Sequence, residues 1–352
     1  MRYPTGRAIA LLAFFLVRLG AAQQYRIEQS STDESLRGLS SVSQKIAWAS
    51  GTHGTFLRTL DGGRTWQVGR VPGAEALDFR DVEAFSVTTA YLLSAGPGEA
   101  SRIYKTTDAG KTWKLQYTNQ DPKGFFDCMA FWDREHGIVL GDPVDGKFVL
   151  LRTDDGGRVW KQISPKQLPM AQGGEGAFAA SGSCIAVQGS KNVWFGTGGK
   201  VARVFRSSNR GQTWAVAETP IVHGNESWGI FSVAFRDRVH GVIVGGDYKH
   251  PQQGGGNLAF SNDGGATWRL SEISPQSYFS AVAFRPGKAC GLLAVGAAHA
   301  GYAADAQKRK WVNYWDLGLN AVNFVAEDEA LAVGSKGTIV HFTGLARPCH
   351  EK

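Results

Sequence analysis

The chain of 352 residues is poor in sulfur and has no long run of one chemical character. It contains four cysteines and three methionines, and no apolar stretch is long enough to span a membrane. It has no long Lys/Arg tract of the kind found in nucleic-acid binders, and no histidine pair has ligand spacing. A phosphate loop and a dinucleotide fingerprint are missing despite 45 glycines. These absences argue against a nucleic-acid partner, a metal site and a nucleotide cofactor; we expect no cofactor.

One eight-residue pattern occurs five times. It first appears at 59–66 as TLDGGRTW and returns at 106–113, 153–160, 207–214 and 261–268. Between the aspartate positions of successive copies the steps are 47, 47, 54 and 54 residues, and a period near 50 predicts a propeller or another repeat array. The aspartate (or asparagine) and tryptophan positions are Asp61 and Trp66, Asp108 and Trp113, Asp155 and Trp160, Asn209 and Trp214, and Asp263 and Trp268.

The chemistry of this pattern is that of a tight hairpin turn. Asp or Asn accepts hydrogen bonds from nearby backbone N–H groups, and Gly adopts the positive φ that the reversal needs. The pattern Ser/Thr-x-Asp-x-Gly-x-Thr-Trp resembles the Asp-box, or bacterial neuraminidase repeat. That resemblance implies a structural turn between the third and fourth strands of a propeller blade, away from the ligand face.

Short apolar runs between the turns form a second repeat. Seven of them end in glycine, at Gly51, Gly96, Gly141, Gly196, Gly245, Gly296 and Gly334. Short runs rich in β-branched and aromatic residues predict buried strands. With a shorter strand before most runs and strands on both sides of each turn, the pattern predicts an all-β, seven-bladed propeller. The seventh repeat lacks a fourth strand, so we expect the N-terminal strand at 25–28 to complete it and close the ring.

The two ends of the sequence predict export and a single domain. Residues 1–22 combine Arg2 and Arg7 with an apolar run at 8–17 and small residues at 20–22, as in a cleaved signal peptide. The segment carries three arginines and no acidic residue, so its removal lowers the formal charge from +7 to +4. We expect a secreted or periplasmic, monomeric protein with one propeller at 23–346 and a tail at 347–352.

Four cysteines in an exported protein predict two disulfides. Cys128 and Cys184 occupy matching positions in consecutive repeats, which favours pairing them. Cys290 and Cys349 would then join the sixth repeat to the tail. Four cysteines allow three pairings, and only the register favours this one.

Candidate binding residues lie where propeller loops line one end of the central channel. These are the loops from each fourth strand to the next first strand and from each second strand to the third. The longest loop of the second kind is 245–257, and long loops on a rigid scaffold often carry binding residues. The candidates are Arg80, Asp81, Arg102, Asp142, Lys147, Trp228, Asp247 and His250.

An alternative interpretation is a glycoside hydrolase. A sialidase-like enzyme needs an arginine cluster for the substrate carboxylate and a Tyr nucleophile beside a carboxylate. The candidate acid is Glu226 or Asp127, and the candidate nucleophile is Tyr248 beside it. Arg80 and Arg102 suit an arginine cluster, but no third arginine occupies a matching position.

The whole arrangement resembles the photosystem II stability and assembly factor family over residues 25–345. The resemblance rests on the five turns, on second strands ending in Gly such as 331–334, and on the closing segment 337–341. It implies a non-catalytic assembly chaperone that binds a newly made reaction-centre subunit, partly through arginines. No arginine patch matches residue by residue. Our leading hypothesis is therefore an exported propeller that binds a protein or a glycan.

Overall fold

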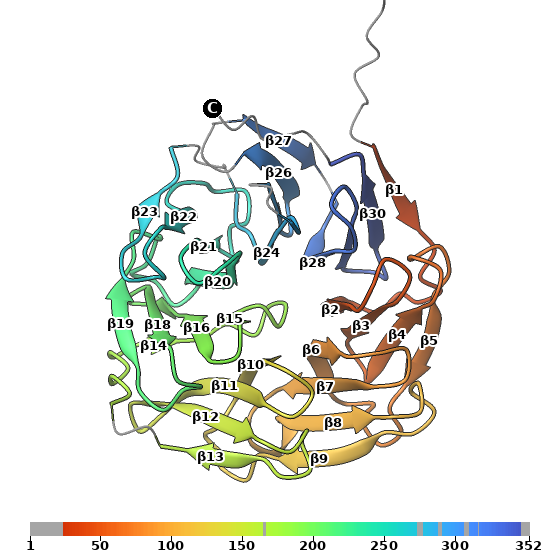
Figure 1. Ribbon diagram of the computed structural model, residues 1–352, viewed down its shortest axis with the longest axis horizontal. Coiled ribbons are helices and arrows are strands. Elements are labelled where there is room, and N and C mark those ends of the chain that lie inside the picture. The colour runs from red at the N-terminus through yellow and green to blue at the C-terminus, as the bar shows by residue number, and fades with distance from the viewer. Residues whose placement is uncertain are drawn as a thin grey trace, which may run out of the picture.

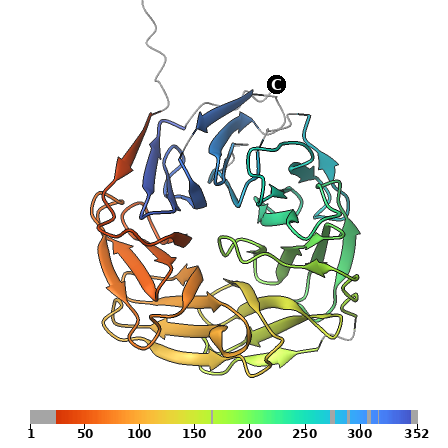
Figure 2. The ribbon, with the colours of Figure 1, turned by 180° about the vertical axis from the view of Figure 1, so that it is seen from behind.

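The computed structural model describes residues 24–164, 167–272, 277–287, 291–305, 310–315 and 317–345. The expected signal peptide and tail, with Cys290 and Cys349, lie outside these residues. Seven sheets surround a central opening, which confirms the predicted all-β, seven-bladed propeller (Figures 1 and 2). The helical element within the described ranges is one 3-10 turn, η1 (Gly98–Ala100), and none of their helices is long and apolar enough to cross a bilayer.

The first three sheets follow the sequence with four antiparallel strands each. They are β2 (Leu36–Ser41), β3 (Ala47–Gly51), β4 (Thr55–Thr59) and β5 (Gln67–Arg70); β6 (Asp78–Ala84), β7 (Ala90–Ala95), β8 (Arg102–Thr106) and β9 (Lys114–Thr118); and β10 (Phe126–Phe131), β11 (Gly137–Val144), β12 (Lys147–Thr153) and β13 (Lys161–Ile163).

The next three sheets keep this order, and the fifth gains two short strands at its inner edge. They are β15 (Ile185–Gln188), β16 (Asn192–Gly196), β18 (Arg203–Ser207) and β19 (Ala215–Glu218); β20 (Trp228–Phe235), β21 (Gly241–Asp247), β22 (Leu258–Ser261) and β23 (Arg269–Leu270), with β14 (Glu175–Gly176) and β17 (Gly198–Gly199) added; and β24 (Ala281–Phe284), β25 (Leu292–Val295), β26 (His299–Asp305) and β27 (Lys310–Trp315).

The seventh sheet closes the ring as predicted. It contains β28 (Leu319–Phe324), β29 (Ala330–Gly334) and β30 (Ile339–Thr343), and the N-terminal strand β1 (Gln24–Glu28) pairs with β30. Tyr25 lies opposite Phe342 in this antiparallel pair. The two ends of the described propeller are therefore joined by backbone hydrogen bonds, which leaves no unpaired gap in the ring.

The five repeated turns share one hydrogen-bond pattern and join third strands to fourth strands. In the first, Thr65 donates to Asp61 through its backbone N–H (2.9 Å) and its hydroxyl (2.7 Å). The N–H of Gly63 donates to the Thr59 hydroxyl at 2.9 Å. Trp66 then packs against Leu331 and Val333 of the seventh sheet. Each turn thus fixes a hairpin locally, while its tryptophan fills the space between neighbouring blades.

A β-bulge interrupts the first strand of five blades. The extra residue lies opposite the end of the second strand and is Arg37, Arg80, Asp127, Phe231 or Asn320 in turn. The glycine that ends the second strand makes room for it. A Cβ would lie 2.6 Å from the Ser35 carbonyl oxygen at Gly51 and 2.5 Å from that of Phe125 at Gly141, which is too close.

Candidate functional site at the channel mouth

Two insertions converge at one end of the channel, where the first strands begin; we call this end the channel mouth. Each insertion lies in an interval where the step between successive turns is 54 residues instead of 47. One insertion precedes β15, and its segment 177–183 reaches into the central opening in both ribbon views (Figures 1 and 2). The other is the loop 248–257, between β21 and β22.

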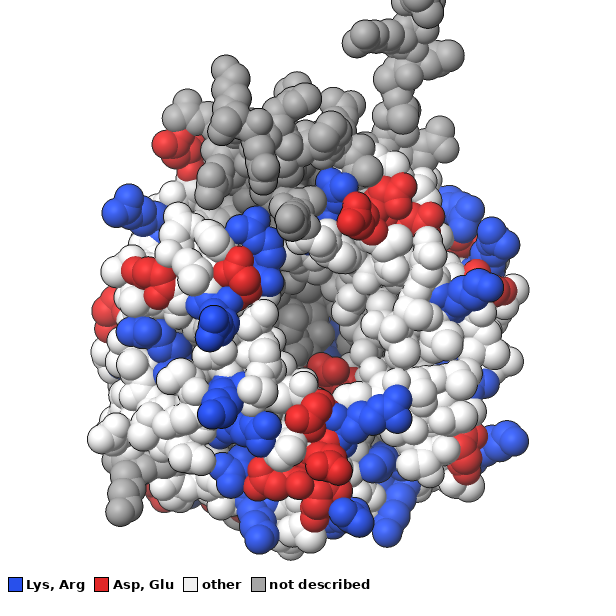
Figure 3. All heavy atoms as spheres, viewed as in Figure 1, with Lys and Arg blue, Asp and Glu red and all other residues white. Residues whose placement is uncertain are grey.

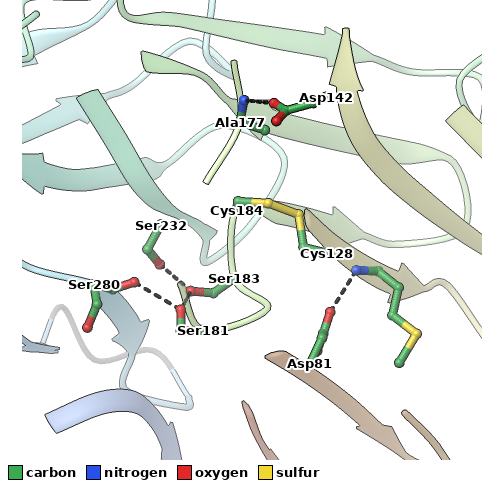
Figure 4. The surroundings of a disulfide bond; sticks show 10 residues. Asp81, Cys128, Asp142, Ala177, Ser181, Ser183, Cys184, Ser232 and Ser280 are labelled. Carbon is green, nitrogen blue, oxygen red and sulfur yellow. Dashed lines mark hydrogen bonds between the residues drawn. A yellow bond between two sulfur atoms is a disulfide. The ribbon is translucent and has the colours of Figure 1, made fainter. Parts of the chain in front are cut away.

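Hydrogen bonds to several blades hold the segment 177–183 in place (Figure 4). Ala177 N–H donates to Asp142 of β11 at 2.9 Å. The Ser181 hydroxyl donates to the carbonyl oxygen of Ser280, beside β24, at 2.9 Å. The Ser183 hydroxyl donates to that of Ser232 on β20 at 2.8 Å. These contacts come from the third, fifth and sixth blades, so the segment is fixed across the channel.

A disulfide and a close carboxyl contact complete this attachment. Cys128 of β10 and Cys184 form the predicted bridge, with Cα atoms 6.1 Å apart. Asp81 of β6 accepts a hydrogen bond from the Met129 N–H at 2.6 Å. Gly182, at φ 76°, lies directly against the Asp81 carboxyl, where a Cβ would clash with it.

A buried ion pair anchors the start of the first insertion. Glu175 of β14 accepts hydrogen bonds from Arg203 Nε (2.9 Å) and Nη2 (2.5 Å), and both residues are at most 6% exposed. The Thr197 hydroxyl donates to the same carboxylate at 2.6 Å. The bidentate geometry satisfies both charges inside the protein. Glu175 therefore positions the insertion.

Aromatic rings from both insertions form a wall at the mouth. Phe178 stacks on Phe231, the bulge residue of β20, with centroids 4.0 Å apart. Tyr278 meets Phe231 edge-on at 4.7 Å. Tyr248 packs its ring at 6.0 Å from Phe231 and remains 46% exposed. The wall thus presents a partly accessible aromatic surface.

Most of the sequence-predicted candidates lie on strands, so their placement in loops was wrong. The bulges lengthen the first strands, and most connections after the second strands are short, the loop 248–257 excepted. Arg80 and Asp81 lie on β6, Asp127 on β10, Trp228 on β20, Arg102 on β8, Asp142 on β11, Lys147 on β12 and Asp247 on β21. Only Glu226, Tyr248 and His250 of the candidates lie between strands.

The structure gathers these candidates in two groups. In the fifth blade, Trp228 faces Asp247 across the strand pair, and Asp247 pairs with His250 Nδ1 at 2.6 Å. Towards the first insertion, Arg80 donates to the Ala179 carbonyl oxygen at 2.7 Å and Asp142 accepts from Ala177. Arg102 belongs to neither group and donates a hydrogen bond to the Glu99 carbonyl oxygen at 2.7 Å. Lys147 is exposed at the start of β12.

The candidate acid and nucleophile do not form one constellation. Glu226, with a side chain 79% exposed, pairs with Lys249 Nζ at 2.5 Å. That contact lowers the pKa of Glu226, which does not suit a general acid. Asp127 is 1% exposed, and burial, reinforced by Asp142, raises its pKa. Within the described residues, the Tyr248 ring contacts Phe178 and Phe231 and pairs with neither carboxylate.

A pocket of about 620 Å³ with a mixed polar and apolar lining lies beside the mouth. Its lining combines the Asp142 and Glu226 carboxylates with the backbone of the glycine-rich stretch 172–177. Burial raises the pKa of Asp142, and the Ala177 N–H opposes the rise. No group of three or more His, Cys, Asp or Glu side chains in the described ranges is arranged to hold a metal ion.

Sequence reasoning missed Arg37 and the aromatic pair Phe178 and Phe231. Arg37 and Phe231 sit at first-strand bulges, and a bulge is not visible in a pattern of apolar residues. The change from 47-residue to 54-residue steps was the available signal for Phe178, because it marks an insertion before the fourth blade.

Charges of both signs are interspersed on the face seen in Figure 3. Acidic side chains gather below the central opening in this view, with basic side chains on both sides. This face carries no large field of a single sign.

The protein is 28% identical over 188 residues to the photosystem II assembly lipoprotein Ycf48 of a Nostoc species. The same protein of Trichormus variabilis is 28% identical over 187 residues. Each match covers 51% of this chain and 46% of the relative, so it spans about half the length of the curated relatives. No protein-family model matches the sequence.

This protein resembles Ycf48. The solved structure of YCF48 bound to D1 peptide has a TM-score of 0.64 and 16% identity, over 91% of this chain and 96% of that one. YCF48 from Cyanidioschyzon merolae has a TM-score of 0.61 and 17% identity, over 91% of this chain and 98% of that one. The structure of U3-55K also has a TM-score of 0.64, at 11% identity, over 92% of this chain and 99% of that one. These structural likenesses therefore establish the fold alone. The family resemblance expected from the sequence is confirmed.

Proposed function

We propose that this protein is an exported, non-catalytic propeller that binds a segment of another protein at the channel mouth. The observation that carries the proposal is the aromatic wall of Phe178, Phe231, Tyr248 and Tyr278, which two insertions build on an otherwise regular ring. Tyr248 is the exposed ring of this wall, at 46%, and it is backed by the buried rings of Phe231 and Tyr278. An accessible aromatic side chain on a rigid support is a typical anchor of a protein interface. The resemblance to Ycf48, which was solved with a bound D1 peptide, supports a polypeptide ligand.

The same mouth gives little support to the glycoside hydrolase alternative. The Glu226 carboxylate is neutralised by Lys249, and Asp127 is buried within β10. Neither is placed to act with Tyr248 on one substrate atom. A glycan remains a second ligand class, because an exposed tyrosine ring such as that of Tyr248 can stack on a sugar.

A peptide-binding titration tests the proposal. The purified mature protein is titrated with the D1 peptide and with an array of unrelated peptides and glycans, by calorimetry or fluorescence. We expect peptide binding that weakens at least tenfold in Tyr248→Ala. Leu115→Ala is the matched control, because Leu115 is similarly exposed (44%) on the outer strand β9. Glycan binding without peptide binding, or hydrolysis of a fluorogenic glycoside that Glu226→Gln abolishes, would overturn the proposal.

A further inference from the structure

The pocket beside the channel mouth is open because glycine forms much of its wall. Its lining includes Gly146, Gly173, Gly174, Gly176, Gly198 and Gly199. At Gly199 a Cβ would clash with the Gly174 carbonyl oxygen, and at Gly176 it would lie 2.9 Å from Asp142 Oδ1. A volume of about 620 Å³ is within the range of small-molecule sites and also admits one long side chain.

Asp142 of β11 contributes a carboxyl group to the lining of this pocket. Its Oδ1 atom accepts the Ala177 N–H at 2.9 Å, whereas Oδ2 has no hydrogen-bond partner among the described residues (Figure 4). Burial raises the pKa of Asp142, and no cation of the described residues counters the rise. Leaving a largely buried carboxylate without a cation is costly for a folded protein. The described part of the fold thus leaves this charge uncompensated.

A second carboxyl group lies close to the first. Asp127 is 1% exposed, and its Oδ2 atom has no hydrogen-bond partner in the described ranges. Burial raises the pKa of Asp127, and repulsion from Asp142 adds to the rise, so the two carboxyls are neighbours. Arg80 opposes this rise, but it already donates to Asp78 and to the Ala179 carbonyl oxygen. A cation in the pocket would therefore be favourable for both carboxyls.

The lysines around the pocket have other partners. Lys123 pairs with Asp145 at 3.2 Å, Lys200 donates to the Gly224 carbonyl oxygen at 3.3 Å, and Lys249 pairs with Glu226 at 2.5 Å. None of the three pairs with Asp142 in the part of the chain that the structure describes. The missing cation is therefore one that a ligand can supply.

We propose that this pocket binds an aliphatic primary ammonium group, with Asp142 as its counter-ion. An ammonium group has three N–H donors, and the free Asp142 Oδ2 can accept one of them. Pro143, Ala171 and Phe178 supply apolar lining, which suits the methylene stem of such a cation. The ammonium belongs either to a lysine of a polypeptide bound at the mouth or to a free alkylamine. Only the first source rests on the proposed function.

Four small probes test the site without a natural ligand. They are N-acetyl-Gly-Lys-Gly amide, the same peptide with norleucine in place of lysine, n-pentylamine, and tetramethylammonium, titrated against the full mature protein by NMR. We expect the lysine peptide or pentylamine to bind about tenfold more tightly than the norleucine peptide and tetramethylammonium. The tighter of the first two identifies the source of the ammonium. Equal binding by the norleucine peptide or by tetramethylammonium, or no binding at all, overturns the proposal.

Asp142→Asn is the decisive variant, because asparagine removes the charge and keeps an acceptor for the Ala177 N–H. We expect it to reduce ammonium binding to the level of the norleucine peptide. Asp154→Asn is the matched control: it makes the same charge change in the same blade, at a side chain that is 54% exposed and paired with Arg152. A retained ammonium preference in Asp142→Asn rejects the site.

The thermal midpoint of the unliganded Asp142→Asn protein supplies a second readout. It should equal or exceed that of the wild type, because the substitution removes a charge that lacks a counter-ion. A clear decrease would assign the Asp142 charge to the fold and overturn its role as a ligand's counter-ion.

This proposal and the proposed function fail in different ways. Amine probes that bind through Asp142, with no binding of D1 peptide or array peptides, support the pocket and reject the protein-binding function. Peptide binding that depends on Tyr248, with no amine binding that depends on Asp142, supports the function and rejects the ammonium site.

Discussion

The repeated turns and the first-strand bulges both occur at equivalent places in successive blades. The residue types at the turns repeat from blade to blade, whereas those at the bulges do not. The turns keep Asp or Asn in all five copies, because the side chain satisfies the turn backbone directly. The bulges carry Arg37, Arg80, Asp127, Phe231 and Asn320, with no common chemistry. The turns therefore preserve the fold, and the bulge positions are free to differentiate the channel mouth.

Removing the disulfide, which anchors the mouth rather than the turns, should have the largest effect. Cys128 and Cys184 are 56 residues apart, so their link reduces the unfolded-state entropy considerably. We expect the double variant Cys128→Ala, Cys184→Ala to lose about 4 kcal/mol of unfolding free energy, measured by urea denaturation. Wild-type protein under reducing conditions should show a similar loss. A change below about 1 kcal/mol would mean that the insertion is held by its hydrogen bonds instead.

Breaking the Glu175–Arg203 ion pair should have the next largest effect. Glu175→Gln leaves Arg203 buried with an incomplete set of partners, and we expect a loss of about 3 kcal/mol in urea denaturation. Glu226→Gln is the control, because its exposed pair with Lys249 is screened by solvent and should contribute little to stability. Similar losses in the two variants would contradict the assigned difference between a structural and a solvated carboxylate.

The turns should respond to the loss of hydrogen bonds but tolerate a change of charge. Asp61→Ala removes the acceptor used by Thr65, and we expect a loss of about 1–2 kcal/mol in thermal or urea unfolding. Asp61→Asn should remain close to the wild type, since Asn209 forms the equivalent bonds in the fourth blade. A large loss in Asp61→Asn would show that the negative charge itself is required there.

The two regions should also depend on pH with opposite sign. Burial raises the pKa of Glu83 on β6 from 4.5 to about 8, so its stabilising contribution is complete below pH 4.5 and is lost as the pH rises through 8. Hydrogen bonds from Thr112 lower the pKa of Asp108 from 3.8 to about 2. The contribution of Asp108 is therefore present above pH 3.8 and is lost as the pH falls through 2.

Thermal unfolding measured across pH tests this contrast. Glu83→Gln should flatten the decline of the wild-type midpoint between pH 5 and about pH 8, and Asp108→Asn should alter the curve only below about pH 4. A Glu83→Gln curve parallel to that of the wild type would show that Glu83 ionises normally in the folded state.

Most of the fold was predictable from the sequence because local chemistry repeats along it. Asp or Asn with glycine specifies each turn, and apolar runs of strand length specify the strands between. The incomplete seventh repeat even indicated that the segment at 25–28 would pair with the last strand. These features depend on residues close together in the sequence.

The candidate site was less predictable because it depends on distant residues. Ser181 and Ser280 are 99 residues apart in the sequence, and only the closed arrangement of blades brings them within hydrogen-bond distance. Phe178 could be inferred as part of an insertion but not as the stacking partner of Phe231. Glu226 and Asp127 looked equivalent as carboxylates, whereas burial and Lys249 give them opposite pKa shifts.

The sequence by itself determined the seven-bladed ring, its closure and its turns, since each follows from short-range hydrogen bonding and strand patterning. The tertiary structure alone decided which side chains meet at the channel mouth, which carboxylates are buried and which are paired with a cation. The physical reason is that burial and charge pairing are properties of the space between blades, and that space exists only once the ring has closed.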